Sequence, residues 1–257
     1  MPLAVEGLVI VALILLPALL GVILVRRFLP ASFHRANLAV AEPIWAILGV
    51  TYGLLLGFMV VTLWGDLQEA QKTVQEEAND MICLNELTYA FPDSTTTPPA
   101  VMRERIKVYA QQVVDVEWSE LGRHRGDPGA DATFDALWNM YRRLDLEVGS
   151  EVESYDESIK LMISLQKARN GRISAARDVV PTALWVVLLG GVAVMIGTVW
   201  FTGSEDLRTH LLMAAILAIS LASILFLIRA FNNPFGGDLR VDPGPIELVL
   251  QRLDAVQ

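Results

Sequence analysis

The sequence predicts an all-α integral membrane protein: four transmembrane helices, with a helical soluble domain inserted between the second and the third. Apolar residues make up 53% of the 257 positions and charged residues only 19%, which is more apolar than an ordinary soluble domain. Four uncharged runs reach the length of about 20 helical residues needed to cross the hydrocarbon core of a bilayer. No alternating pattern typical of β-strands is long enough to compete with this assignment.

The four apolar runs are interpreted as retained membrane spans. They cover residues 7–25, 44–64, 182–201 and 211–228. The first is not a secretory signal, because Glu6 precedes it and Arg26 and Arg27 follow it without a cleavage site of small residues. Tryptophans frame the second and third spans, where indole rings favour the lipid headgroups.

The spans divide the chain into four segments. Residues 1–65 hold the first two transmembrane helices, 66–178 the soluble domain, 179–231 the last two helices, and 232–257 a C-terminal tail. The soluble domain is acidic, with 21 acidic and 13 basic residues and a net charge of −8. It therefore carries most of the net charge of −9 of the whole chain.

The soluble domain is predicted to contain four helices. Leu67, Val74, Ala78 and Ile82 form one apolar stripe, so the second span should continue out of the membrane as one long helix. The second helix should cover about 100–121, with Pro98 and Pro99 at its start. A third should be capped by Asp131 or Thr133 and run to about Val148. A fourth is expected over about 152–176.

Motifs of common enzymes are absent from the sequence, which has no phosphate-binding loop, nucleophile elbow or HExxH zinc motif. The acidic pairs Glu76–Glu77 and Asp156–Glu157 are interpreted as solvated helix faces rather than catalytic carboxylates. We therefore expect no catalytic residues and no enzymatic activity, and nothing indicates nucleic acid binding.

The sequence also argues against a metal or cofactor. Cys83 is the single cysteine, and His34, His124 and His210 lie in three different polar connections without metal-ligand spacing. Asp238 and Asp242 in the tail are weak candidates for a calcium site, because calcium takes six or more oxygen ligands. No cofactor is expected.

The second span carries glycines at every fourth position, Gly49, Gly53 and Gly57. Glycines at this spacing let another helix approach closely, as in membrane helix dimers. The approaching helix could belong to the same subunit or to a neighbouring one, and the spacing alone favours neither.

Next to the glycines, Val50, Leu54 and Phe58 also recur every four residues. In a ring of identical helices they would form three stacked apolar collars, and hydrophobic constrictions of this kind gate channels by dewetting. The alternative is ordinary contact with lipid or with the protein core.

Two motifs resemble the bestrophin ion channels. The stretch Leu55-Leu56-Gly57-Phe58-Met59-Val60 followed by Thr62-Leu63-Trp64 is similar to the second span of bestrophins, where an apolar stretch ending in Leu-Gly-Phe forms the pore neck. Asn233, Pro234, Phe235 and Gly236, directly after the fourth span, resemble the Asn-Pro-Phe-Gly segment at the same place in that family. The order of two spans, a helical insertion and two further spans also matches.

The resemblance to bacterial bestrophin-like proteins implies a homopentameric channel that passes small monovalent ions. Its neck positions would fall on Val50, Leu54 and Phe58, the face found from spacing. The acidic domain would act as a vestibule that concentrates cations, so we expect a preference for cations. The run of acidic residues of the bestrophin calcium clasp is reduced here to Asp238 and Asp242, so calcium gating is not expected.

Basic residues in the connections set the expected orientation. Four lie on one side (Arg26, Arg27, Arg35 and Arg208) and seven on the other (Lys72, Lys167, Arg169, Arg172, Arg177, Arg229 and Arg240). The positive-inside rule then places the soluble domain and both termini in the cytoplasm. The resemblance to bacterial bestrophin-like proteins implies that the spans lie in the inner membrane of a bacterium.

A second hypothesis is a membrane-bound sensor or scaffold, whose helical domain binds a ligand or a partner and transmits a shift through the long helix. In that case the domain would face away from the cytoplasm, with the arginines after the first span inside. A reporter at Gln257 distinguishes the two orientations.

Overall fold

The computed structural model describes residues 3–28, 38–92, 97–144, 150–201, 206–237 and 239–255. Within these ranges every regular element is a helix, which confirms the predicted all-α class. The chain forms two compact units. Unit 1 comprises residues 1–65 and 179–232, and unit 2 comprises residues 66–178 and 233–257.

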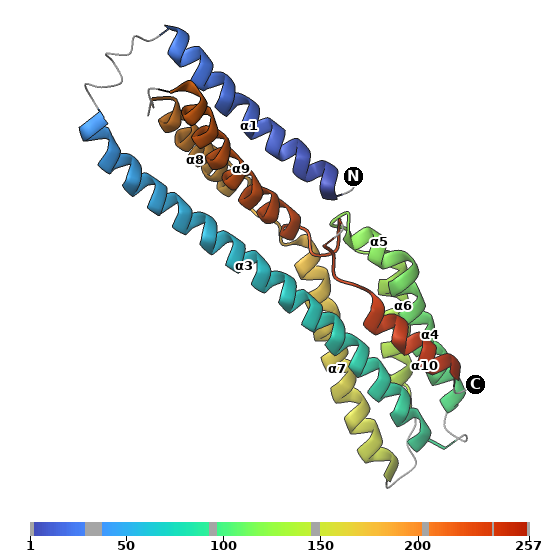
Figure 1. Cartoon of the computed structure of the whole chain (residues 1–257). Helices are drawn as coiled ribbons and strands as arrows, with labels where there is room; N and C mark the ends of the chain where they lie inside the picture. The colour runs from blue at the N-terminus through green and yellow to red at the C-terminus, as the bar shows by residue number, and fades with distance from the viewer. Residues whose placement is uncertain are drawn as a thin grey trace. The chain divides into compact units, whose positions relative to one another are not determined.

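Three helices of unit 1 pack closely on one another: α1 (Leu3–Phe28), α8 (Thr182–Phe201) and α9 (Leu207–Phe231). They lie side by side in the upper part of Figure 1. The face of α9 that meets them carries the buried alanines Ala214, Ala218 and Ala222, small residues that allow close helix contact. Trp200 on α8 donates an indole hydrogen bond to the carbonyl of Ala18 on α1, at 3.2 Å.

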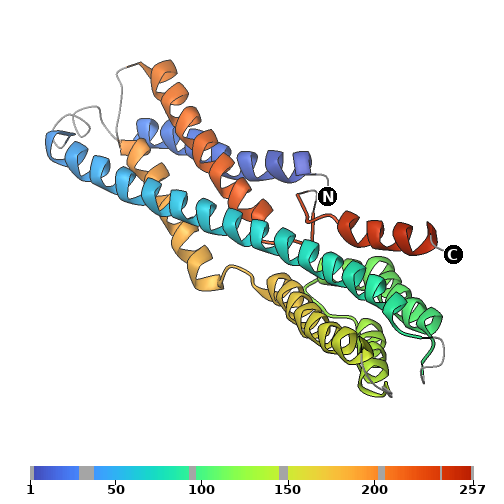
Figure 2. The same cartoon turned by 90° about the horizontal axis from the view of Figure 1, so that it is seen from below.

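The second span belongs to α3 (Leu38–Leu87), a single helix of 50 residues. Its ribbon runs unbroken from blue to teal in both views (Figures 1 and 2). The prediction of one long helix is therefore confirmed. Together with α1, α8 and α9, it gives four helices in the described part of the chain that are long and apolar enough to cross a membrane, as expected from the sequence.

Unit 2 adds the helices of the soluble domain and of the tail. They are α4 (Pro99–Gln112), the π-helical turn η2 (Val113–Glu117), α5 (Trp118–Leu121), α6 (Pro128–Arg142), α7 (Ser150–Arg177) and α10 (Gly244–Ala255). A short 3₁₀ turn, η1 (Thr88–Ala90), follows α3. In both views α7 lies beside the second half of α3 (Figures 1 and 2).

The start of α6 differs from the prediction. The helix is capped by Asp127, whose carboxylate accepts a hydrogen bond from the amide of Ala130 at 2.9 Å, not by Asp131 or Thr133. Pro128 occupies the first turn, where a missing N–H costs nothing. This earlier start leaves Asp131 free for another contact, described below, while Val148 lies outside the described residues.

Candidate functional site

One face of α3 in the membrane span is apolar and uncovered. Ile47, Val50, Leu54, Phe58 and Val61 are exposed to between 61% and 74%. With about 3.6 residues per turn, these five positions share one stripe along the helix. Only 11% of the most apolar stretch of this span is buried within the protomer, compared with 33% for α9. The predicted neck residues therefore lie in the middle of the most open stripe of the span.

The opposite face of α3 holds the helix against the rest of unit 1. Leu56 and Leu63 are buried, and the Tyr52 hydroxyl donates a hydrogen bond to the carbonyl of Leu188 on α8, at 2.5 Å. A side chain on Gly191 of α8 would overlap the Tyr52 ring, so this glycine lets the tyrosine lie flat against α8. These contacts leave the stripe from Ile47 to Val61 turned away from α8.

The three glycines lie between these two faces and differ in their surroundings. A β-carbon on Gly49 would lie 3.6 Å from the Met195 methyl group on α8, whereas one on Gly53 or Gly57 would meet nothing within 4 Å. Packing within the subunit therefore accounts for Gly49 alone. Gly53 and Gly57 offer a flat, open surface beside the apolar stripe.

The segment after the fourth span is a folded corner of unit 2. Asn233 donates from its side-chain amide to the carbonyl of Gly122, at 3.0 Å. Phe235 is buried and packs edge-on against Trp118, with ring centroids 5.5 Å apart. The Trp118 indole in turn donates to the carbonyl of Val241, at 3.3 Å. The motif thus fixes the tail against α5 by side-chain and backbone contacts.

The weak metal candidates do not gather into a site in the described part of the chain. There, no group of three or more His, Cys, Asp or Glu side chains is placed to hold a metal ion. Asp242 accepts a hydrogen bond from the amide of Gly244 at 3.3 Å, at the start of α10. Asp238 lies outside the described residues.

Unit 2 contains a buried network of charged side chains. Arg172 on α7 is fully buried and contacts Glu77 on α3 through two hydrogen bonds of 2.5 and 3.0 Å, and Glu117 on η2 through one of 2.7 Å. Arg169 continues the network to Glu117 at 3.1 Å and to Asp131 on α6 at 2.7 Å. Four elements are joined in this way.

Two carboxylates and an aromatic ring stabilise the charged guanidinium of Arg172. Burial opposes its charge, but the carboxylates of Glu77 and Glu117 outweigh burial and raise the pKa of Arg172 well above its usual value. The Tyr109 hydroxyl donates to Glu77 at 2.5 Å, and burial together with that carboxylate raises the pKa of Tyr109. The Trp118 ring lies 5.7 Å from the Arg172 guanidinium, at cation–π distance.

Comparison with known proteins gives consistent results. The sequence profile of the Bestrophin-like domain matches residues 12–246. This chain belongs to the Bestrophin-like family. No curated protein sequence matches it.

Solved structures share the fold of this bestrophin-like chain. Two single-residue mutants of a bacterial bestrophin homologue from Klebsiella pneumoniae both superpose with a TM-score of 0.70. They are 14% and 13% identical and cover 95% and 97% of this chain and 98% of their own. A third structure, a mutant described as a membrane protein, has a TM-score of 0.67 at 14% identity, covering 96% of this chain and 97% of that one.

Sequence reasoning missed the charged network of this bestrophin-like protein. The interpretation of Glu76 and Glu77 as solvated is wrong for Glu77, which is 0% exposed, and holds for Glu76, which contacts Lys72 at the surface. A signal was present: Glu77 lies within the buried stripe of Val74, Ala78 and Met81. A charge inside an apolar stripe needs a buried partner of opposite sign, and Arg172 on α7 is that partner.

Proposed function

We propose that this bestrophin-like chain assembles into a homopentameric ion channel, whose pore is lined by the Val50, Leu54 and Phe58 face of α3. Small monovalent ions would pass through it passively, with a preference for cations. The observation that carries the proposal is the uncovered apolar stripe of α3, bordered by Gly53 and Gly57, where a β-carbon would meet no described residue within 4 Å.

The glycine surface supports assembly through α3. In the membrane, helices associate through close packing of small residues rather than by the hydrophobic effect. Gly53 and Gly57 have no neighbour within 4 Å of a β-carbon, so a helix from another subunit can approach there. That contact would turn the adjoining stripe toward the axis of a ring.

The side chains of the stripe suit a neck. Val50, Leu54 and Phe58 are 74%, 61% and 64% exposed and would form three apolar rings about one helical turn apart. An apolar constriction lets ions pass only while it is wetted. The acidic residues of the soluble domain, which continues directly from α3, would raise the local concentration of cations.

Ion flux from liposomes containing the purified protein tests the proposal. Potassium, sodium and chloride gradients are measured separately, and the oligomer mass is determined on the same sample. We expect a pentamer with selective flux. A stable, inserted oligomer without flux of any of the three ions would overturn the channel function and favour a sensor or scaffold.

A double substitution tests the neck itself. Leu54→Ala with Phe58→Ala should widen the constriction and increase ion leak severalfold without changing the oligomer. Leu212→Ala with Ile216→Ala on α9 is the matched control, because these residues are also spaced by four and are 61% and 58% exposed. Equal flux in the two double variants would contradict the assignment of the neck to α3.

The orientation follows from the distribution of basic residues and has its own test. We propose that the soluble domain and both termini face the cytoplasm of a bacterium, with the spans in the inner membrane. A reporter that is active only in the cytoplasm, fused after Gln257, should be active. Inactivity, together with activity of an exported reporter at the same place, would reverse the orientation.

A further inference from the structure

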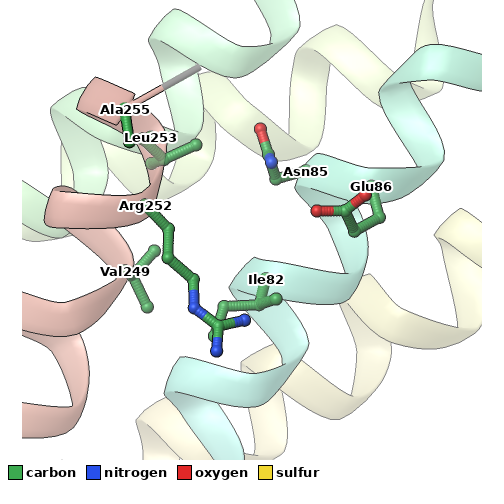
Figure 3. A pocket seen from close by; sticks show the side chains of 7 residues that line it. All are labelled: Ile82, Asn85, Glu86, Val249, Arg252, Leu253 and Ala255. Carbon is green, nitrogen blue, oxygen red and sulfur yellow. The ribbon is translucent and has the colours of Figure 1, made fainter.

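A small cavity lies in unit 2 between the last turns of α3 and the C-terminal helix α10. Its volume is about 190 Å³. Figure 3 shows the seven side chains that line it, three from α3 and four from α10. They are Ile82, Asn85, Glu86, Val249, Arg252, Leu253 and Ala255.

The α10 wall of the cavity is held in place by the rest of unit 2. Ile246, Val249 and Leu253 are buried, and α10 packs on α4. An ion pair of 2.6 Å between Lys107 on α4 and Asp254 on α10 adds to this packing. The cavity is therefore bordered by two anchored helices rather than by a loose tail.

One buried polar group that lines the cavity lacks a partner. Asn85 is only 5% exposed, and its side-chain oxygen has no hydrogen-bond partner. A buried acceptor without a donor costs free energy, and such groups in folded proteins usually meet a water or a ligand. Glu86 and Arg252 form no ion pair with each other or with any other residue in the described ranges.

Figure 3 shows Asn85 and Glu86 on the α3 side of the cavity and Arg252 on the α10 side, with the Arg252 guanidinium beside Ile82. One wall thus offers a carboxylate and an amide oxygen, and the other a guanidinium. Ile82, Val249 and Leu253 add an apolar surface. A ligand that satisfies all of these groups carries a positive charge, a negative charge and a short apolar part.

We propose that this cavity binds a small zwitterion of the α-amino acid type. Its carboxylate would bind the Arg252 guanidinium, which suits a carboxylate geometrically. Its ammonium group would donate to Glu86 and to the Asn85 oxygen, and its side chain would pack on Val249 and Leu253. A volume of about 190 Å³ fits one amino acid but neither a nucleotide nor a folded peptide.

Calorimetry on the full-length protein in detergent tests this site without reference to ion conduction. The probes are L-leucine, L-valine and L-serine, together with 4-methylpentanoate and 3-methylbutylamine, which keep the alkyl chain of leucine but carry only one of its two charges. We expect saturable binding of at least one amino acid and at least about tenfold weaker binding of both single-charge compounds.

Two surface substitutions locate the binding. Arg252→Gln and Glu86→Gln should each weaken amino acid binding at least about tenfold. Arg105 on α4 and Glu247 on α10 are exposed and do not line the cavity. The control substitutions Arg105→Gln and Glu247→Gln should therefore leave amino acid binding unchanged. The oligomer mass and melting temperature without ligand check that each variant is folded.

Three outcomes would overturn the proposal. The first is no saturable binding of any of the three amino acids up to about 10 mM. The second is binding of 4-methylpentanoate as tight as that of L-leucine, which would show that the site recognises carboxylates alone. The third is amino acid binding that Arg252→Gln and Glu86→Gln leave unchanged, which would place the ligand elsewhere.

Discussion

Arg172 is the residue on which the buried network of unit 2 depends. It is 0% exposed and pairs with two carboxylates, Glu77 and Glu117, that are also 0% exposed. Transfer of these charges from water is costly, and their pairing repays that cost only while each has its partner. Loss of one charged member should therefore destabilise the fold more than replacement of the whole network by apolar residues.

Substitution of Arg172 by methionine should lower the free energy of unfolding by about 3–5 kcal/mol, because Glu77 and Glu117 remain buried without their main counter-charge. Denaturant unfolding of the detergent-solubilised protein, followed by helical circular dichroism, measures the change. Arg177→Met, at an exposed position of the same helix, is the control and should have little effect. Adding Glu77→Gln to Arg172→Met should recover part of the loss. A loss no larger than that of the control would contradict the structural role.

The surroundings of Asp80 disfavour the charged form of its carboxyl group. Burial raises its pKa above the usual value, repulsion from Glu76 and Glu77 adds to this, and a hydrogen bond with Ser164 opposes it. One of its carboxylate oxygens is buried without a partner. Ionised Asp80 therefore destabilises unit 2.

Substitution of Asp80 by asparagine should raise the melting temperature at pH 7. The folded state binds the Asp80 proton more tightly than the unfolded state does, so the penalty in the wild type is complete above the raised pKa. It fades as the pH falls toward the ordinary value of about 3.9. Thermal unfolding of both proteins across this range measures the difference. A variant that is no more stable than wild type at pH 7 would contradict the prediction.

At the level of helices, the sequence correctly predicted those whose position depends on the local pattern of apolar residues. The four spans follow from uninterrupted apolar runs, and α3 from an apolar stripe that continues past Trp64. The cap of α6 was placed four or six residues too late, because Asp127, Asp131 and Thr133 are all residue types that can cap a helix. The π turn η2 has no sequence signature of its own. Glu117 at its end and Trp118 directly after it are both buried.

A substitution at Gly57 tests whether α3 forms the contact between subunits. Leucine at this position should reduce the proposed pentamer to smaller species, since the added side chain would hold neighbouring helices apart. It should leave the protomer folded, because a β-carbon there meets nothing within 4 Å. Native mass spectrometry gives the oligomer, and circular dichroism gives the fold. Gly197→Leu on α8, another glycine with open space around it, is the matched control. The same pentamer in both variants would argue against assembly through α3.

For the whole molecule, the family was predictable because two short motifs lie at the right places in the order of spans. The spacing of Val50, Leu54 and Phe58 predicted that they share one face of α3 but left open whether that face is buried, and the structure shows that it is exposed. The cavity at Asn85 and Arg252 was not predictable, because α10 and the end of α3 are more than 150 residues apart in the chain. Only folding of the tail against α4 brings them together.

The charge of the soluble domain gives the last prediction, which concerns ion selectivity. Residues 66–178 carry a net charge of −8, while the stripe from Ile47 to Val61 carries no charge. If cation preference arises in the domain, it depends on screening, whose length is about 30 Å at 0.01 M salt and about 3 Å at 1 M.

Reversal potentials in planar bilayers, taken under a fixed ratio of potassium chloride across the membrane, measure the selectivity at both concentrations. The preference for potassium over chloride should be clear at low salt and should fall severalfold at high salt, because a screened charge no longer enriches cations at the pore mouth. The neck variant with Leu54→Ala and Phe58→Ala is a useful control, since it should conduct more while keeping the same dependence on salt. A preference that does not change with salt would assign selectivity to the neck, and an anion preference at low salt would show that the domain does not face the conduction path.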